Sequence, residues 1–192
     1  MLKKSLSSLL LLILTSSSAQ ALSITNIEQS KLPRPYNFLL TQPLMTQTLE
    51  QYYKRTPIIQ TQSTYFDPTQ NNYARTITML IDRDKQRNNA TYAQKTGVAQ
   101  VIELAFIKMN FSELPKEVIE EIRHTNTPFG KLIEKYQIKI LTQNRVYFTT
   151  ACTKEIASLM PCDLHKALYG RKNTIIRADN KQWLAQVMEI LP

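Results

Sequence analysis

Segments with the length and composition of β-strands recur along this chain, separated by turns and short helical stretches. They are rich in β-branched and aromatic residues, and several alternate between apolar and polar side chains. The segments with this character are 57–66, 73–81, 98–111, 137–149, 173–178 and 183–191. Strands joined by hairpins and short helices, without a regular strand–helix–strand alternation, predict an α+β domain around a mostly antiparallel sheet.

Helical spacing is confined to short stretches between these strands. Residues 43–54 carry apolar side chains at helical intervals, and two further short helices are predicted after Pro115 and Pro128. A polar helical stretch near 153–168 is interrupted by a proline, and 82–91 reads as a polar hairpin loop. Residues 22–40 are expected to form an irregular lead-in, so the folded domain is placed at 41–192.

The first 21 residues differ in character from the rest of the chain. Lys3 and Lys4 precede an apolar block from Leu9 to Leu14, and an Ala-Gln-Ala sequence follows at 19–21. A basic start, a short apolar core and an A-x-A exit are typical of a secretory signal peptide. The alternative is a buried N-terminal helix. We expect 1–21 to be a signal peptide, and the protein to be exported to the periplasm or beyond the cell without a stable membrane anchor.

The composition indicates a folded, basic protein. Hydrophobic residues make up 43% of the chain and charged residues 20%, which is too apolar for a disordered segment. The formal net charge is +9, or +7 without Lys3 and Lys4. Such a surplus of positive charge suits acidic partners. Because the charged residues are scattered along the chain, the default interpretation is a solvated basic surface. No aromatic-plus-basic motif is present, so nucleic acid is not an expected partner.

Cys152 and Cys162 are the two cysteines of the chain. In an oxidising compartment such a pair favours a disulfide. A catalytic pair of Cys162 with His165 or His124 is the alternative that the spacing leaves open. No metal-binding spacing of cysteine, histidine or carboxylate residues occurs, so no metal is expected.

Several short motifs occur in an order that resembles the chorismate pyruvate-lyase family. Gly130 lies in the segment 127–133 (TPFGKLI), and Gly170 lies in 168–173 (LYGRKN), followed by a hairpin ending in Ile-Leu-Pro. Upstream, Met45 looks like a helix methionine of that family, and Arg75 looks like its strand arginine. The chain departs from the family pattern in a longer hairpin loop after Arg75, and in a phenylalanine before Gly130.

The resemblance implies a sheet of about six antiparallel strands with helices packed on one face, and a largely enclosed cavity. It implies removal of pyruvate from chorismate to leave 4-hydroxybenzoate, without a metal or an organic cofactor. Arg75 would hold the ring carboxylate through its planar guanidinium, and Met45 and Phe129 would form apolar walls against the ring.

The last strand leaves the position of the family's catalytic glutamate open. Three alignments place Met188, Gln186 or Glu189 there, and strand alternation puts the first two on one face and Glu189 on the other. Glu103, on the long strand 98–111, is a further source of a carboxylate. The candidate set is therefore Arg75 and Glu189 for catalysis, and Met45, Arg75, Phe129, Gln186 and Met188 for substrate binding.

Three hypotheses follow. The chain is an exported lyase acting on chorismate or a related precursor, a monomeric periplasmic binder of a small aromatic carboxylate, or a secreted interaction protein whose pocket is filled. Chorismate is made and used in the cytoplasm, which weighs against the first. The same fold also serves, without catalysis, as the effector-binding domain of some bacterial transcription regulators, which supports the second.

Overall fold

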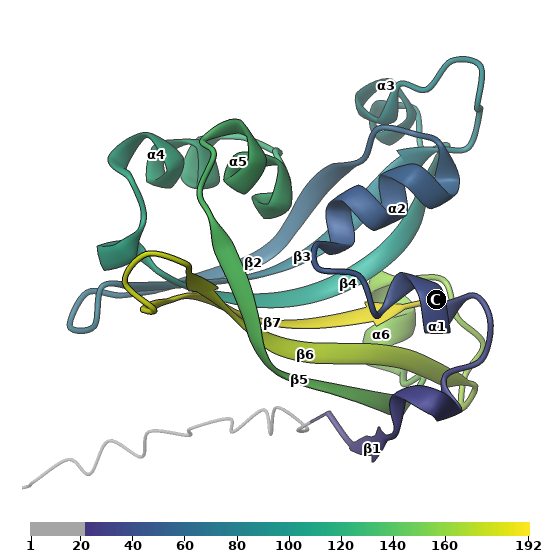
Figure 1. The fold of residues 1–192 in the computed structure, drawn as a ribbon. Helices are drawn as coiled ribbons and strands as arrows, with labels where there is room; N and C mark the ends of the chain where they lie inside the picture. Colours follow the sequence, from purple (N-terminus) through teal and green to yellow (C-terminus); the bar gives the residue numbers. More distant parts are fainter. Residues whose placement is uncertain (1–21) are drawn as a thin grey trace, which may run out of the picture.

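Seven strands form one antiparallel sheet in the computed structural model, which describes residues 22–192. The proposed signal peptide therefore lies outside the described residues. The strand order is β1-β5-β6-β7-β4-β3-β2 (Figure 1). The strands are β1 (Ile24–Ile27), β2 (Ile58–Asp67), β3 (Asn72–Asp82), β4 (Ala99–Asn110), β5 (Ile140–Ala151), β6 (Ala167–Arg177) and β7 (Trp183–Leu191). The predicted α+β class with an antiparallel sheet is confirmed.

Short helices connect the strands and cover mainly one face of the sheet. They are α1 (Tyr36–Leu39), α2 (Met45–Tyr53), α3 (Ala90–Lys95), α4 (Lys116–His124), α5 (Phe129–Lys135) and α6 (Lys154–Leu159), with 3-10 turns η1 (Gln29–Lys31) and η2 (Phe111–Glu113). Helices α1, α2, α4 and α5 lie on the same side of the sheet, and α6 lies on the opposite side near one end (Figure 1). No helix in residues 22–192 is long and apolar enough to cross a membrane.

Three parts of the chain differ from the prediction, one of which is the strand expected at 173–178: β6 already begins at Ala167, and the helix expected near 153–168 is limited to α6. Residues 22–40 are not irregular, because β1 pairs antiparallel with β5 and adds a seventh strand. The two prolines of this stretch come after β1 and leave its ladder intact. The loop expected at 82–91 is closed by α3, whose first turn is capped by the Asn89 side chain accepting a hydrogen bond from the Tyr92 amide.

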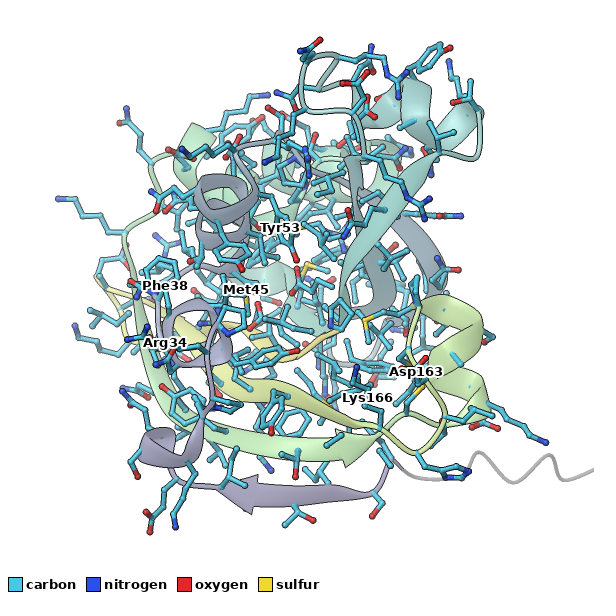
Figure 2. The ribbon with its side chains drawn as sticks, turned by 90° about the vertical axis from the view of Figure 1, so that its right-hand side faces the viewer. Arg34, Phe38, Met45, Tyr53, Asp163 and Lys166 are labelled. Atoms are coloured by element: carbon cyan, nitrogen blue, oxygen red, sulfur yellow. A yellow bond between two sulfur atoms is a disulfide. The ribbon has the colours of Figure 1, made fainter. Side chains whose placement is uncertain are left out.

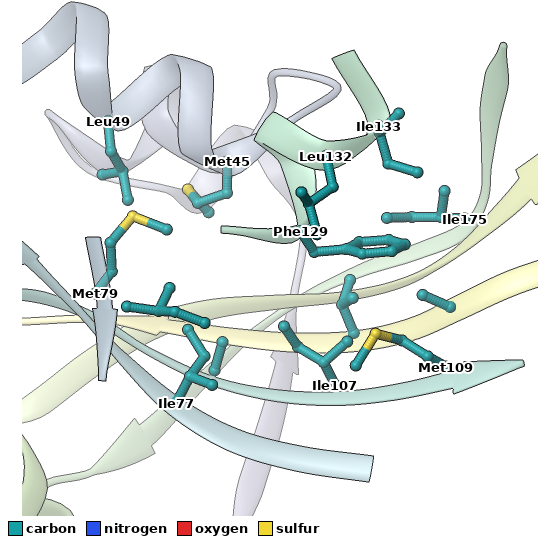
Figure 3. Close-up of a cluster of buried hydrophobic side chains, with 14 of the residues drawn as sticks. Met45, Leu49, Ile77, Met79, Ile107, Met109, Phe129, Leu132, Ile133 and Ile175 are labelled. Carbon is teal, nitrogen blue, oxygen red and sulfur yellow. The ribbon is translucent and has the colours of Figure 1, made fainter. Parts of the chain in front are cut away.

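The main core lies between the sheet and the helices above it (Figure 3). Met45 and Leu49 of α2 and Phe129 and Leu132 of α5 point down onto the sheet. They face apolar side chains from alternate positions of β3, β4 and β6, among them Ile77, Met79, Ile107, Met109 and Ile175. In the turned view Met45 lies inside the molecule, whereas Arg34 and Phe38 lie at the surface around α1 (Figure 2).

A smaller core lies on the opposite face, under α6. Ile156 of α6 packs there with Leu104, Phe148 and Ile190 from three strands. Cys152 and Cys162 are joined by a disulfide that closes the loop containing α6. Both cysteines of the chain are therefore bonded, and neither sulfur is available as a catalytic thiol.

Candidate functional site

A small cavity lies between the helix-covered face of the sheet and helices α2 and α5. Its volume is about 40 Å³, and its lining combines an apolar surface with four ionisable side chains. The ionisable residues are Arg75 of β3, Glu103 of β4, Arg171 of β6 and Glu189 of β7. All four are buried, so their charges must be balanced within the protein or by a bound group.

Strand pairing decides which residues of the last strand reach this cavity. Glu189 pairs with Ala105 of β4 and Arg171 of β6, both of which line the cavity. Gln186 and Met188 have the opposite parity and lie on the other face of the sheet. Of the three alignments considered for the last strand, the structure places Glu189 at the cavity and directs Gln186 and Met188 away from it.

Arg171 is fully engaged in holding the fold around the cavity. Its side chain is 1% exposed, and its Nε donates to a carboxylate oxygen of Glu189. Its Nη1 donates to the carbonyl oxygens of Leu40, at 3.0 Å, and Gln42, in the link between α1 and α2. Arg171 was not among the candidate site residues, although it directly follows Gly170 in the segment that carried the resemblance.

Gly170 is required by the close approach of its neighbours. A Cβ atom at this position would lie 2.4 Å from the ring of Phe148 and 2.5 Å from the Glu189 carbonyl oxygen. Gly130 plays a similar part between the helices, since a Cβ there would lie 2.9 Å from Thr46 Oγ1. The small residue lets α5 pack directly against α2 over the cavity.

Glu103 is a buried acid beside the Arg171–Glu189 ion pair. Its side chain is buried, and its Oε2 atom has no hydrogen-bond partner among residues 22–192. Burial, reinforced by the nearby Glu189 carboxylate, raises the pKa of Glu103 well above its ordinary value. The neutral form of Glu103 is therefore favoured, and in that form its carboxyl can donate a proton or a hydrogen bond within the cavity.

Arg75 stands apart from this cluster and lacks a counterion. It is 3% exposed, and its one hydrogen bond goes from Nη1 to the Ile122 carbonyl oxygen, at 3.4 Å. Its Nε and Nη2 atoms have no partner, and no carboxylate in the described chain forms an ion pair with it. Burial lowers the pKa of Arg75 to about 10, so the guanidinium is still charged at neutral pH. A buried guanidinium without a counterion is a candidate binding site for an anion.

Met45 and Phe129 form the apolar roof of the cavity. They extend from α2 and α5 toward the sheet and are 3% and 5% exposed (Figure 3). The structure thus brings together four of the sequence-predicted residues, namely Met45, Arg75, Phe129 and Glu189. It adds Glu103, which the sequence offered as an alternative, and Arg171.

The cavity in this conformation is too small for an aromatic ligand. A volume of about 40 Å³ holds on the order of three water molecules, whereas pockets for organic ligands measure roughly 300–1,000 Å³. A ring could enter only if Met45 and Phe129 changed rotamer or if α2 and α5 moved away from the sheet. No cluster of side chains suited to a metal ion occurs among residues 22–192.

Comparisons with known proteins identify the fold. No family model and no curated protein matches the chain. Among solved structures, PhnF of Mycobacterium smegmatis aligns over 79% of this chain and 64% of its own, with 10% identity and a TM-score of 0.53. YydK of Bacillus subtilis, a possible transcriptional regulator, aligns over 80% and 64%, with 11% identity and a TM-score of 0.52. A GntR-family regulator of Enterococcus faecalis aligns over 69% and 91%, with 13% identity and a TM-score of 0.42.

These findings correct the family assignment made from the motifs. The similar structures include YydK, described as a possible transcriptional regulator, and PhnF, and the likeness shows that the chain has the α+β fold called chorismate lyase-like. Assignment to the chorismate pyruvate-lyase family itself is wrong, since no family model matches the chain and the similar structure YydK is described as a possible transcriptional regulator. The chain spans 64% of the length of YydK and of PhnF.

Proposed function

We propose that this protein binds a small aromatic carboxylate in the cavity beneath α2 and α5, with Arg75 holding the carboxylate. The observation that carries the proposal is the guanidinium of Arg75, which is buried with Nε and Nη2 unpartnered at the wall of this cavity. These two nitrogens can donate to the two oxygens of one carboxylate. Binding would supply the counterion that the described fold lacks.

The apolar roof suits the rest of such a ligand. Met45 is adaptable and Phe129 can stack against a ring, so both can make room and then contact its faces. At the other side of the cavity, the neutral carboxyl of Glu103 can donate a hydrogen bond to a hydroxyl group. A ligand with a carboxylate at one end and a hydroxyl at the other, such as 4-hydroxybenzoate, matches this arrangement of a cation, an apolar roof and a hydrogen-bond donor.

Elimination of pyruvate from chorismate is a second candidate function, favoured by the neutral Glu103. In that reaction the ether bond between the ring and the enolpyruvyl oxygen breaks, the ring loses a proton and becomes aromatic, and enolpyruvate gains a proton to become pyruvate. A protonated carboxyl can neutralise the departing oxygen. Glu189 is not suited to donate this proton, because its carboxylate is paired with Arg171.

The test compares binding and turnover in one set of proteins. We expect 4-hydroxybenzoate to raise the melting temperature of the protein and to give a saturable calorimetric titration, whereas the neutral 4-hydroxybenzamide gives neither. Arg75→Met abolishes both responses, and Arg83→Met, which alters an exposed arginine, preserves them. Release of pyruvate from chorismate by the parent and not by Glu103→Gln would identify the lyase. Equal responses of the parent and Arg75→Met would refute the proposal.

We also propose that the protein is exported. The support is the basic and apolar character of the first 21 residues together with the Cys152–Cys162 disulfide in the folded domain. Expression of the full chain in a bacterium, followed by fractionation and N-terminal sequencing, should give a periplasmic or secreted protein that begins at Leu22. A cytoplasmic protein that retains Met1 would contradict this proposal.

A further inference from the structure

A second depression crosses the opposite face of the sheet, in the part that α6 does not cover. It has a volume of about 700 Å³ and is lined by three consecutive residues from each of β3, β4, β7 and β6, continuing onto β2 and β5. We call it the outer groove. Because neighbouring strands lie about 4.8 Å apart, a groove that crosses six strands is roughly 24 Å long.

Strand register defines the two walls of the outer groove. One wall is a row of paired positions that runs from Lys172 through Met188, Phe106 and Thr76 to Ser63. The other wall is the parallel row from Thr174 through Gln186, Lys108 and Ala74 to Tyr65. The residues between the rows have the opposite parity and direct their side chains to the inner face, so the floor is backbone.

Most of the exposed surface in the groove is apolar, and its walls also carry two lysines and the polar side chains of Ser63, Thr76, Thr174 and Gln186. Phe106 is 37% exposed and Tyr65 is 69% exposed, so both aromatic side chains are accessible to a ligand in the groove. None of the described residues that line the groove is acidic. Lys108 and Lys172 take part in none of the ion pairs within residues 22–192; Lys108 instead lies 5.9 Å from the centre of the Trp183 ring.

We infer that the outer groove binds an anionic amphiphile, a long-chain carboxylate whose apolar chain lies across the strands and whose head group is held between Lys108 and Lys172, with both lysines contributing. The backbone groups of the floor are already used in the sheet ladders, so the groove offers little to a peptide backbone and suits a chain without hydrogen-bonding groups. A second copy of the protein would bring the same lysines against each other, which like charge disfavours.

Trp183 gives a direct readout, because it is the single tryptophan of the chain and contacts Lys108. We expect palmitate, added below its micelle concentration, to change Trp183 emission in a saturable manner. Dodecylamine, a cationic amphiphile, leaves it unchanged. Equilibrium dialysis with radiolabelled palmitate provides an affinity that does not depend on the environment of Trp183.

The lysines are tested by charge reversal. Lys172→Glu should weaken palmitate binding about tenfold, since a charge-assisted contact is replaced by repulsion. Lys95→Glu, the same change on exposed α3, should leave the affinity within about twofold, because it is not at the groove. Glu103→Gln, a change at the inner cavity in a residue that does not line the groove, should also leave it unchanged, which separates this site from the inner cavity.

Three results would overturn the inference. They are an absence of palmitate binding to the parent, equal affinities of the parent and Lys172→Glu, and equal binding of dodecylamine and palmitate. Sedimentation analysis completes the test. A parent dimer that Lys172→Glu disrupts would show that this face is an interface between copies of the chain.

Discussion

Replacing Arg75 by methionine should make the ligand-free protein more stable while removing its response to carboxylates. Burial lowers the pKa of Arg75 to about 10, against about 12.5 for a free guanidinium, and each pKa unit corresponds to about 1.4 kcal/mol. The charged form is therefore destabilised by about 3 kcal/mol in the folded state. Methionine keeps the unbranched apolar stem of arginine, packs adaptably and needs no counterion, although it is shorter than arginine.

The one hydrogen bond that is lost reduces this gain only slightly. The contact from Arg75 Nη1 to the Ile122 carbonyl oxygen is long, at 3.4 Å, and is worth about 0.5–1 kcal/mol. The net increase in the free energy of unfolding should be about 2 kcal/mol, or roughly 4–8 °C in melting temperature for a chain of this size. Most substitutions at buried positions destabilise, so an increase is a distinctive result.

The assay is urea unfolding at pH 7, followed by Trp183 fluorescence, with Arg83→Met as the control for loss of an exposed arginine. We expect the urea midpoint to rise for Arg75→Met and to stay within experimental error for Arg83→Met. A lower midpoint for Arg75→Met would refute the reasoning. It would mean that the guanidinium already has adequate partners in the fold and that its burial does not indicate a missing anion.

Three further predictions concern the surroundings of the site. Glu103 has a raised pKa, so its contribution to the free energy of unfolding is largest at low pH. That contribution declines as the pH rises above about 4.5, by up to about 1.4 kcal/mol per pH unit until the folded pKa is reached. Glu103→Gln should therefore gain stability relative to the parent between pH 5 and pH 7 in urea titrations, and a constant difference would contradict the raised pKa. Gly170→Ala should lower the free energy of unfolding by about 1–3 kcal/mol, because its Cβ would meet Phe148 and the Glu189 backbone; an unchanged urea midpoint would show that the strands can separate there. The double variant Cys152→Ala, Cys162→Ala should lose about 2–3 kcal/mol through the opening of its short loop, measurable by the same titration, and no loss would indicate that the smaller core alone holds α6.

The parts of the fold that follow from local pattern were predictable from the sequence. The segments that form β3, β4 and β7 are long and apolar, which indicates strands, and the prolines before α4 and α5 mark where those helices begin. Strand β1 was not predictable in the same way. It has four residues, shows no strong alternation, and exists because the edge of β5 is available for pairing.

The candidate site likewise contains residues that local motifs identified and residues whose roles depend on distant parts of the chain. Arg75, Met45 and Phe129 could be selected because a motif pointed to each of them separately. The inward direction of Glu189 depends on its register with Ala105 and Arg171, which lie far away in the sequence. The role of Arg171 depends on the carbonyl groups of Leu40 and Gln42, about 130 residues upstream. The outer groove depends entirely on the order of the strands.

The alternation of side chains along β3, β4, β7 and β6 has a consequence for how this protein can vary. Adjacent residues of one strand direct their side chains to different surfaces. The Arg75 side chain belongs to the inner cavity, while Ala74 and Thr76 belong to the walls of the outer groove. Substitutions can therefore retune one surface and leave the other intact. Insertion or deletion of a single residue within such a strand would exchange the two sets of side chains unless a β-bulge absorbed it, as happens in the β3–β4 pairing between Met79 and Leu80. Without a bulge both surfaces would be lost together, so these strands accept replacement more readily than a change of length.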